Sequence, residues 1–217
     1  MQTIEFYFDP SCPWCWVTSR WLSEVATQRD ISIEWKPFSL AIKNDEIYGD
    51  DSTGHQEPHM KAHKLMRIME AVHAAKGIDR GELYTAFTKA YYLDKDLHDD
   101  ALAAAVLEQL GVDADYIKAG DDGSYDKSLE AFMDEAIAIV GNDVGVPLIV
   151  FVNDEGEKQG YFGPVLQGLP DTQEGLKLWD GIQHLATSKH FFELKRSRTG
   201  GAIPRSTERL FQTGPSK

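Results

Sequence analysis

The feature that most constrains this chain is the motif Cys12-Pro13-Trp14-Cys15, which contains both of its cysteines. Apolar and polar residues alternate over positions 4–8 and predict a strand, which the turn-forming residues 9–11 end. Apolar residues at helical spacing over positions 14–25 predict that a helix follows directly. A Cys-x-x-Cys pair that opens a helix after an N-terminal strand is typical of a redox-active dithiol.

The order strand, turn, helix assigns a separate role to each cysteine. We expect Ser11 to be the N-cap, which places Cys12 in the first turn, where free backbone N–H groups and the helix dipole stabilise a thiolate. Free cysteine has a pKa of about 8.5, and cysteines in such positions reach about 3.5 to 7. Cys12 is therefore the predicted nucleophile and Cys15 the resolving thiol. Pro13 and Trp14 are expected to tune the redox potential without supplying the chemistry.

Other residues are candidates for substrate binding. Pro147 precedes the apolar run 148–152. In one interpretation the Val146-Pro147 peptide bond is cis and faces the cysteines, and the backbone of Val146 hydrogen-bonds an extended thiol substrate. In the other interpretation the proline simply starts a strand. Trp14 is a candidate wall of the acceptor site, on which a flat aromatic could stack, and Trp16 is a further candidate substrate-binding residue.

The sequence also argues against metal and cofactor chemistry. A structural zinc site needs four ligands, and no second cysteine pair exists. His55, His59 and His63 are four residues apart and could join the cysteines in a mixed site, but we expect an exposed histidine stripe on a polar helix face. No dinucleotide-binding glycine motif and no recognisable flavin element occur, so we expect no metal, no tightly bound cofactor, and electrons supplied by thiols.

The middle of the chain changes character. From about residue 59 to residue 140, apolar residues recur at helical spacing in successive stretches. Gly77, Gly111 and Gly141 fall just past the ends of three of these stretches, as helix C-caps do. This region is therefore predicted to be an all-helical insertion.

The flanking regions supply the rest of an α/β domain. A strand over 31–35 follows the first helix, which makes a βαβ unit. After the insertion, strands over 148–152 and 158–162 are joined by a turn at 153–156, and a helix over 172–187 follows.

Together these elements predict a thioredoxin fold, βαβ plus ββα, with an all-helical domain inserted between the halves. We expect residues 1–56 and 142–217 to form the discontinuous thioredoxin-like domain and 57–141 the insertion. From about Gly200 onward no sustained periodicity is found, apart from a turn of helix at 208–211, and this end is expected to be mobile.

Charge and composition limit the partners. The net charge of −13 opposes a phosphate backbone, so we expect no nucleic acid, and no apolar run is long enough for a membrane span. The start of the chain lacks the pattern of a secretory signal, which predicts a reducing cytoplasmic location. From Lys189 to the end, the sequence contains seven Lys or Arg and only two Glu. This basic segment is interpreted either as a solvated tail or as a segment that contacts an anionic ligand or the acidic remainder of the same chain. The sequence is compatible with a homodimer but does not predict the oligomeric state.

The stretch Phe8–Trp16, combined with Gly145-Val146-Pro147 after a helical insert, resembles the DsbA-like branch of the thioredoxin superfamily. Within that branch the chain is most similar to the actinobacterial mycothiol-dependent nitroreductases, through the stretches Cys12–Trp21, Phe162–Leu166 and His190–Arg196. The resemblance implies an enzyme that carries electrons from mycothiol, a low-molecular-weight thiol, through Cys12 and Cys15 to disulfide or electron-poor acceptors, including nitroaromatic compounds.

Two other functions are weighed against this one. A relative of kappa-class glutathione transferases and 2-hydroxychromene-2-carboxylate isomerases would share the insertion topology, but those proteins usually carry serine at the position of Cys12. A redox-switched binding module without turnover would use the same cysteine pair to change the angle between sheet and helices.

Overall fold

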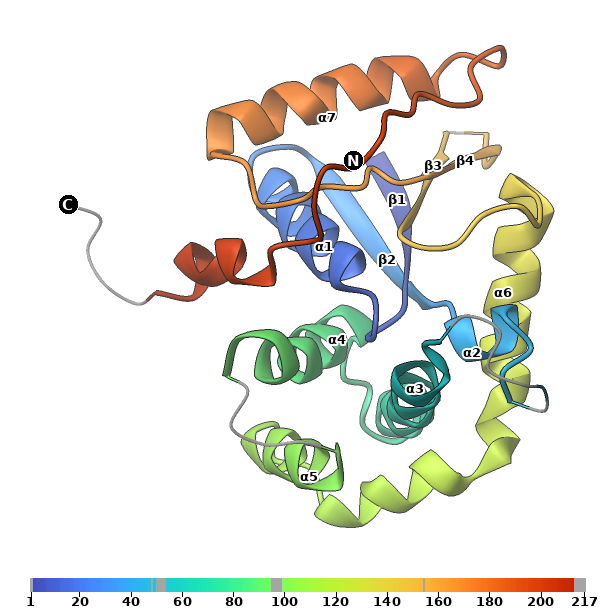
Figure 1. Cartoon of the computed structure of the whole chain (residues 1–217), viewed down its shortest axis with the longest axis vertical. Coiled ribbons are helices and arrows are strands. Elements are labelled where there is room, and N and C mark those ends of the chain that lie inside the picture. Colours follow the sequence, from blue (N-terminus) through green and yellow to red (C-terminus); the bar gives the residue numbers. More distant parts are fainter. Residues whose placement is uncertain (1, 48, 50–53, 95–98, 154, 213–217) are drawn as a thin grey trace.

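A computed structural model describes residues 2–47, 49, 54–94, 99–153 and 155–212. Its centre is a four-stranded sheet in the order β2-β1-β3-β4 (Figure 1). The strands are β1 (Gln2–Phe8), β2 (Ile31–Pro37), β3 (Leu148–Val152) and β4 (Lys158–Phe162). β1 runs parallel to β2 and antiparallel to β3, and β4 runs antiparallel to β3.

The helices confirm the predicted thioredoxin fold with a helical insertion between its halves. The α-helices are α1 (Pro13–Ala26), α2 (Leu40–Lys43), α3 (Gln56–Lys76), α4 (Arg80–Lys89), α5 (Asp99–Gln109), α6 (Asp126–Val140) and α7 (Thr172–Ala186). A π-helical segment, η1 (Ala90–Asp94), and three 3₁₀ segments, η2 (Ala114–Asp121), η3 (Gly123–Tyr125) and η4 (Pro204–Phe211), complete them. Within the described residues, no helix combines the length and apolar character that a membrane crossing requires.

Local signals in the sequence explain where several helices end. Gly77 is the C-cap of α3 with a φ of 69°, and Gly141 is the C-cap of α6 with a φ of 82°. Gly111 follows α5 with a φ of 68°. All three predicted caps are confirmed, because glycine enters the left-handed region without a Cβ clash.

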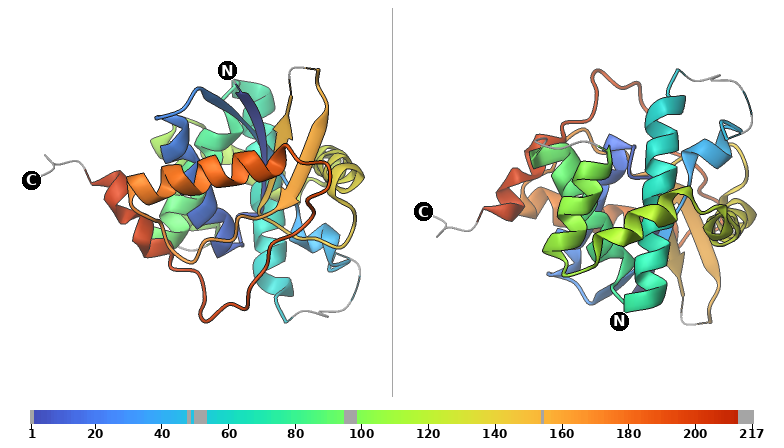
Figure 2. Two further views of the ribbon diagram at one scale, coloured as in Figure 1. Left: turned by 90° about the horizontal axis from the view of Figure 1, so that it is seen from above. Right: turned by 90° about the horizontal axis from the view of Figure 1, so that it is seen from below.

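One face of the sheet is covered by α1 and α7. Trp179 of α7 packs 5.7 Å from the Phe151 ring of β3 and 6.2 Å from the Trp21 ring of α1, measured between centroids. Trp21 is fully buried, as its helical spacing predicts, and its Nε1 donates to the carbonyl of Gly175 at 3.0 Å. Figure 2 shows α7 crossing the molecule on the side away from α3 and α5. This aromatic layer fixes the helix that carries the cysteines against the sheet.

The other face of the sheet carries a buried ion network. Glu5 of β1 is only 3% exposed and accepts from Lys36 at 2.7 Å and from Lys158 at 2.6 Å. Both lysines also pair with Glu135 of α6. Because two ammonium groups meet two carboxylates, the buried charge of Glu5 is compensated, and removal of one partner would be costly.

Residues 204–211 form η4, which confirms the turn of helix expected at 208–211 and corrects the expectation of a mobile end for this stretch; positions 213–217, which that expectation also covered, lie outside the described residues. Trp16 Nε1 of α1 donates to Thr207 Oγ1 of η4 at 3.0 Å, and the Phe211 ring stacks on Trp16 at 5.9 Å. Arg209 forms two hydrogen bonds to Glu24, at 2.8 and 2.6 Å, so the basic segment does contact the acidic body. The sequence indicated only residues 208–211 of this element, because η4 is a 3₁₀ helix, whose apolar residues do not follow a 3.6-residue period.

We predict that Thr207→Val lowers the free energy of unfolding by about 1 to 3 kcal/mol, because it leaves the buried indole N–H of Trp16 without an acceptor. Urea unfolding of the reduced protein measures this change. Thr187→Val, at the exposed C-cap of α7, is the matched control and should cost less than about 0.5 kcal/mol. Equal losses in the two variants would show that η4 does not stabilise α1.

Candidate active site

The N-terminus of α1 differs in one residue from the prediction: the N-cap is Cys12, not Ser11. The backbone N–H and the hydroxyl of Ser11 both donate to Asp9 Oδ1, at 2.8 and 2.6 Å, so Ser11 has no role in capping the helix. Pro13 occupies the first helical position, where its missing N–H costs nothing. Cys12 therefore still lies at the positive end of the α1 dipole.

Asp9 is a fully buried carboxylate that the sequence analysis treated only as a turn residue. Besides its two bonds from Ser11, it accepts from the backbone N–H of Leu40 at 2.8 Å, at the start of α2. Burial raises the pKa of Asp9, and these hydrogen bonds act in the opposite direction. The side chain joins the β1–α1 turn to α2 and thereby fixes the turn that presents Cys12.

The loop before β3 reaches the nucleophilic sulfur from the other half of the fold. The Cys12 thiol donates to the carbonyl oxygen of Val146 with an Sγ to O distance of 3.6 Å. The Val146-Pro147 peptide bond is cis, and Pro147 is buried beside β3. The backbone of Val146 thus faces Cys12 directly.

The two thiols have opposite electrostatic environments. The hydrogen bond from the Cys15 thiol lowers the pKa of Cys12, and the N–H groups of Cys15 and Trp14 add to this effect against burial and the charge of Asp9. Burial raises the pKa of Cys15 well above its usual value. Cys12 is 8% exposed and Cys15 not at all. Of the two cysteines, only Cys12, whose pKa is lowered, therefore has exposed surface.

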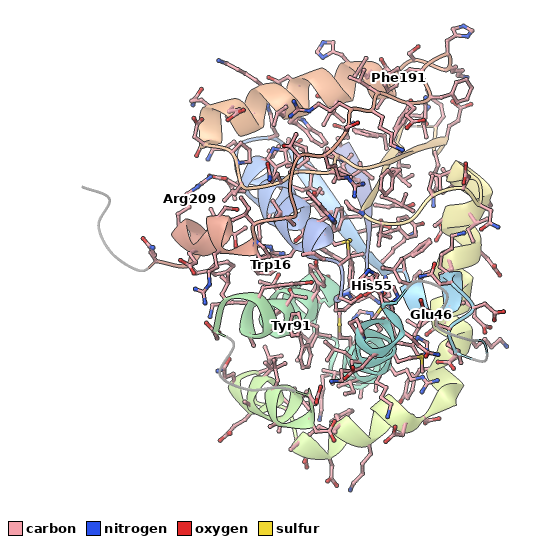
Figure 3. All side chains as sticks on the ribbon, in the orientation of Figure 1. Trp16, Glu46, His55, Tyr91, Phe191 and Arg209 are labelled. Carbon is pink, nitrogen blue, oxygen red and sulfur yellow. The ribbon has the colours of Figure 1, made fainter. Side chains whose placement is uncertain are left out.

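The two tryptophans expected to line the acceptor site lie in different environments. Trp14 is half-buried, and the guanidinium carbon of Arg198 lies 4.9 Å from its ring centroid. Trp16 has no exposed surface: its ring stacks between Tyr92 and Phe211, and Figure 3 shows it between α1, α4 and η4. The structure therefore assigns Trp16 to the core beneath the motif, which corrects the expectation that its side chain contacts substrate directly.

Tyr92 is a further residue near the cysteines that the sequence analysis did not single out as functional. Its hydroxyl donates to the carbonyl of Pro10 at 3.0 Å, which joins η1 to the turn that precedes Cys12. The insertion and the β1–α1 turn are thus in direct contact. Nothing local in the sequence indicates this bond, because its partners come from opposite sides of the insertion boundary.

The expected exposed histidine stripe is wrong for two of its three members. His59 is buried, and its Nδ1 lies 2.6 Å from Glu46 Oε2. His63 is also buried, with Nδ1 2.9 Å from Ser39 Oγ and Nε2 3.0 Å from Asp126 Oδ1. Among the residues that the structure describes, no group of three or more metal-ligating side chains comes together. These histidines join α3 to α2 and α6.

The polar contacts of His59 and His63 lie where α3 meets α6 and the segments around α2. The carbonyl of Glu46, which follows α2, accepts from Gln56 Nε2 at the start of α3 at 2.8 Å. Burial lowers the pKa of His63, so the neutral ring is favoured at this position. The carboxylate partners come from distant segments, which explains why helical spacing alone misassigned these residues.

We predict that Cys15→Ala moves the pH profile of Cys12 alkylation to higher pH, because it removes the thiol that most strongly lowers the pKa of Cys12. Cys15→Ser keeps a hydrogen-bond donor at the same position and should move the profile less. The rate of iodoacetamide alkylation as a function of pH, followed by intact mass, measures both. The thiolate is the reactive form, so a raised pKa must appear as slower alkylation near neutral pH. Identical profiles for all three proteins would contradict this assignment.

Comparison with known proteins places this geometry in a family. Residues 11–196 match the family Rv2466c-like, described as mycothiol-dependent nitroreductase Rv2466c. A relative from Mycobacterium tuberculosis (strain ATCC 25618 / H37Rv), called uncharacterized protein Rv2286c, is 30% identical over 220 residues, which cover 97% of this chain and 88% of the relative.

Solved structures share the fold. The cytosolic disulfide reductase DsbM from Pseudomonas aeruginosa aligns with a TM-score of 0.54 at 15% identity, covering 85% of this chain and 100% of its own. A 2-hydroxychromene-2-carboxylate isomerase aligns at 0.53 and 18%, covering 84% and 95%. The probable DsbA oxidoreductase SCO1869 from Streptomyces coelicolor aligns at 0.51 and 17%, covering 92% and 95%. At these sequence identities the comparisons show a shared fold alone.

The family match spans most of the chain and includes both cysteines of the motif. It agrees with the resemblance drawn from the sequence. The chain therefore belongs to the Rv2466c-like family of mycothiol-dependent nitroreductases and is a thiol-dependent oxidoreductase.

Proposed function

We propose that the Cys12–Cys15 dithiol of this protein carries electrons from mycothiol to disulfide or electron-poor acceptors, including nitroaromatic compounds, in the cytoplasm. The observation that supports this most is the asymmetry of the two thiols. Cys12 has a lowered pKa and some exposed surface, whereas Cys15 has a raised pKa and none. This is the division of labour that a nucleophilic and a resolving thiol require.

The reductive half-cycle begins with the Cys12–Cys15 disulfide. A mycothiol thiolate attacks Cys12, forms a mixed disulfide on it and releases Cys15 as a thiolate, which takes up a proton. A second mycothiol thiolate attacks the mycothiol sulfur of this mixed disulfide, forms mycothiol disulfide and releases Cys12. Two thiols have then supplied two electrons to the protein.

The oxidative half-cycle returns these electrons to an acceptor. With a disulfide acceptor, the Cys12 thiolate forms a mixed disulfide and expels one thiolate; Cys15 then attacks Cys12, expels the second thiolate and loses its proton. With a nitro acceptor, reduction to the nitroso level consumes two electrons and two protons and releases water. One oxidation of the dithiol therefore balances either reaction.

Residues around Cys12 are suited to hold the substrate. The Val146 carbonyl already accepts from the Cys12 thiol, so we assign Val146 and Pro147 as the backbone strip along which an extended thiol substrate lies. Trp14 is half-buried within the motif and forms a wall, and Pro13 stiffens the turn. Trp16 supports this wall from beneath. We assign residues 57–141 to a separate helical unit that covers the site, and no tightly bound cofactor to the reaction.

The isomerase and kappa-transferase alternative is favoured only by a shared fold, and Cys15 argues against it. Those enzymes activate a bound thiol without forming an internal disulfide, whereas here the second thiol adjoins the first. We predict that the air-oxidised protein loses two hydrogen atoms in its intact mass and regains them with a reductant. A persistently unchanged mass under oxidation would favour the transferase-like alternative.

Turnover also distinguishes an enzyme from a redox-switched binding module. We predict that Cys12→Ser abolishes turnover of mycothiol, while Cys15→Ser accumulates a mixed disulfide between Cys12 and mycothiol, because the internal resolving thiol is missing. Intact-mass measurement after incubation with mycothiol disulfide detects the adduct. Ser11→Ala, which keeps both thiols, is the control and should not accumulate it. An active Cys12→Ser enzyme would overturn the proposed function.

A further inference from the structure

The segment Ser188–Ile203, here called the strap, leaves α7 and crosses toward η4 (Figures 1 and 2). Its first anchor is on β4. Gln159 Nε2 donates to the carbonyl of Ser188 at 2.8 Å, and the Phe191 ring lies 5.7 Å from the Tyr161 ring. Figure 3 shows Phe191 at this end, far from Trp16.

The second anchor of the strap lies beside α1. The N–H of Ile203 donates to the carbonyl of Gln167 at 2.6 Å, in the loop that follows β4. This loop is itself joined to α1, because Thr18 Oγ1 donates to the carbonyl of Pro164 at 2.7 Å. The strap is therefore held at both ends, and its middle passes the side of α1 that carries Trp14 and Thr18, which are one helical turn apart.

Arg198 lies in this middle section and contacts Trp14. Its guanidinium carbon is 4.9 Å from the indole centroid, within the range of a cation–π interaction. Within the described part of the chain, Arg198 forms no ion pair and donates no hydrogen bond, and its side chain is exposed. The contact with the ring holds the charge in place while its N–H donors stay available.

The chemistry of this arrangement selects a particular ligand. A guanidinium offers planar, paired donors that match the two oxygens of a carboxylate. The neighbouring indole offers a flat apolar surface for a ring. Because the chain carries a net charge of −13, a cation held on Trp14, two residues from Cys12 in the sequence, also offsets repulsion of an anionic substrate.

We infer that Arg198 and Trp14 form a subsite for aromatic acceptors that carry a ring carboxylate. This inference rests on the proposed function, because the bound ring is to be reduced by Cys12 and Cys15. For an aromatic disulfide, Cys12 forms a bond to one sulfur and the other leaves as an aryl thiolate. Cys15 then closes the internal disulfide, loses its proton and releases the second aryl thiolate.

A pair of pyridyl disulfides tests the subsite. Dithiodinicotinate and dithiodipyridine share the reacting bond and differ in the ring carboxylate. The second-order rate of thiol release by the pre-reduced protein is measured for each by stopped flow. We expect Arg198→Ala to lower the ratio of the dinicotinate rate to the dipyridine rate by about tenfold relative to the unmodified protein.

Two further variants separate a local contact from general charge. Arg196→Ala removes the same charge from the same strap, two residues from Arg198, and should leave the ratio within about twofold. Arg198→Lys keeps the charge but not the paired donors and should give an intermediate ratio. An unchanged ratio in Arg198→Ala, or an equal fall in Arg196→Ala and Arg198→Ala, would overturn the subsite.

Failure of the proposed function would look different. If the pre-reduced, unmodified protein released thiol from neither disulfide, the dithiol chemistry would be wrong, and the subsite with it. If it reacted with both disulfides and Arg198→Ala left the ratio of the two rates unchanged, only the subsite would be wrong.

Discussion

The site depends on a buried carboxylate that shapes the turn before the motif. Asp9 has no exposed surface and accepts three hydrogen bonds, two from Ser11 and one from Leu40. These bonds fix where β1 ends and where α1 begins, which makes Cys12 the N-cap residue. If Asp9 were a residue with no acceptor, these donors would lose their partners and the position of the nucleophile would no longer be specified.

The reactivity of the dithiol then follows from burial and from contacts with distant segments. Cys15 is enclosed by the core, and its thiol stabilises the thiolate of Cys12. Val146 approaches from the opposite half of the fold, so the sheet must assemble before the site exists. The aromatic layer under α1 and the ion network around Glu5 on the other face hold the sheet and helices that make this approach possible.

Much of the fold could be predicted because its signals are local. The alternation that gives β1, the proline that precedes β3 and the glycines after α3 and α6 each act within a few residues of the element they define. The residue types and spacing of the motif also indicated the roles proposed for Cys12 and Cys15.

The remaining parts could not be predicted because they depend on long-range contacts. The hydrogen bond from Trp16 to Thr207 joins residues 191 positions apart, so a tryptophan that was predicted to bind substrate is a core residue. His59 and His63 look solvent-facing by spacing, yet carboxylates from positions 46 and 126 meet them. Arg198 lies in the basic segment for which the sequence allowed two interpretations. Its contact with Trp14 depends on the path of the strap, which the sequence does not indicate.

The contact between η4 and α1 affects the biosynthesis of the protein. Cys12 and Cys15 leave the ribosome long before Thr207 and Arg209, which contact the same helix. Until Val146 and then η4 have been synthesised, the growing polypeptide presents first a dithiol without its partner before β3 and then an uncovered Trp16 indole. Early pairing of these thiols with unrelated partners is therefore a hazard of biosynthesis, one that a reducing environment for translation would relieve.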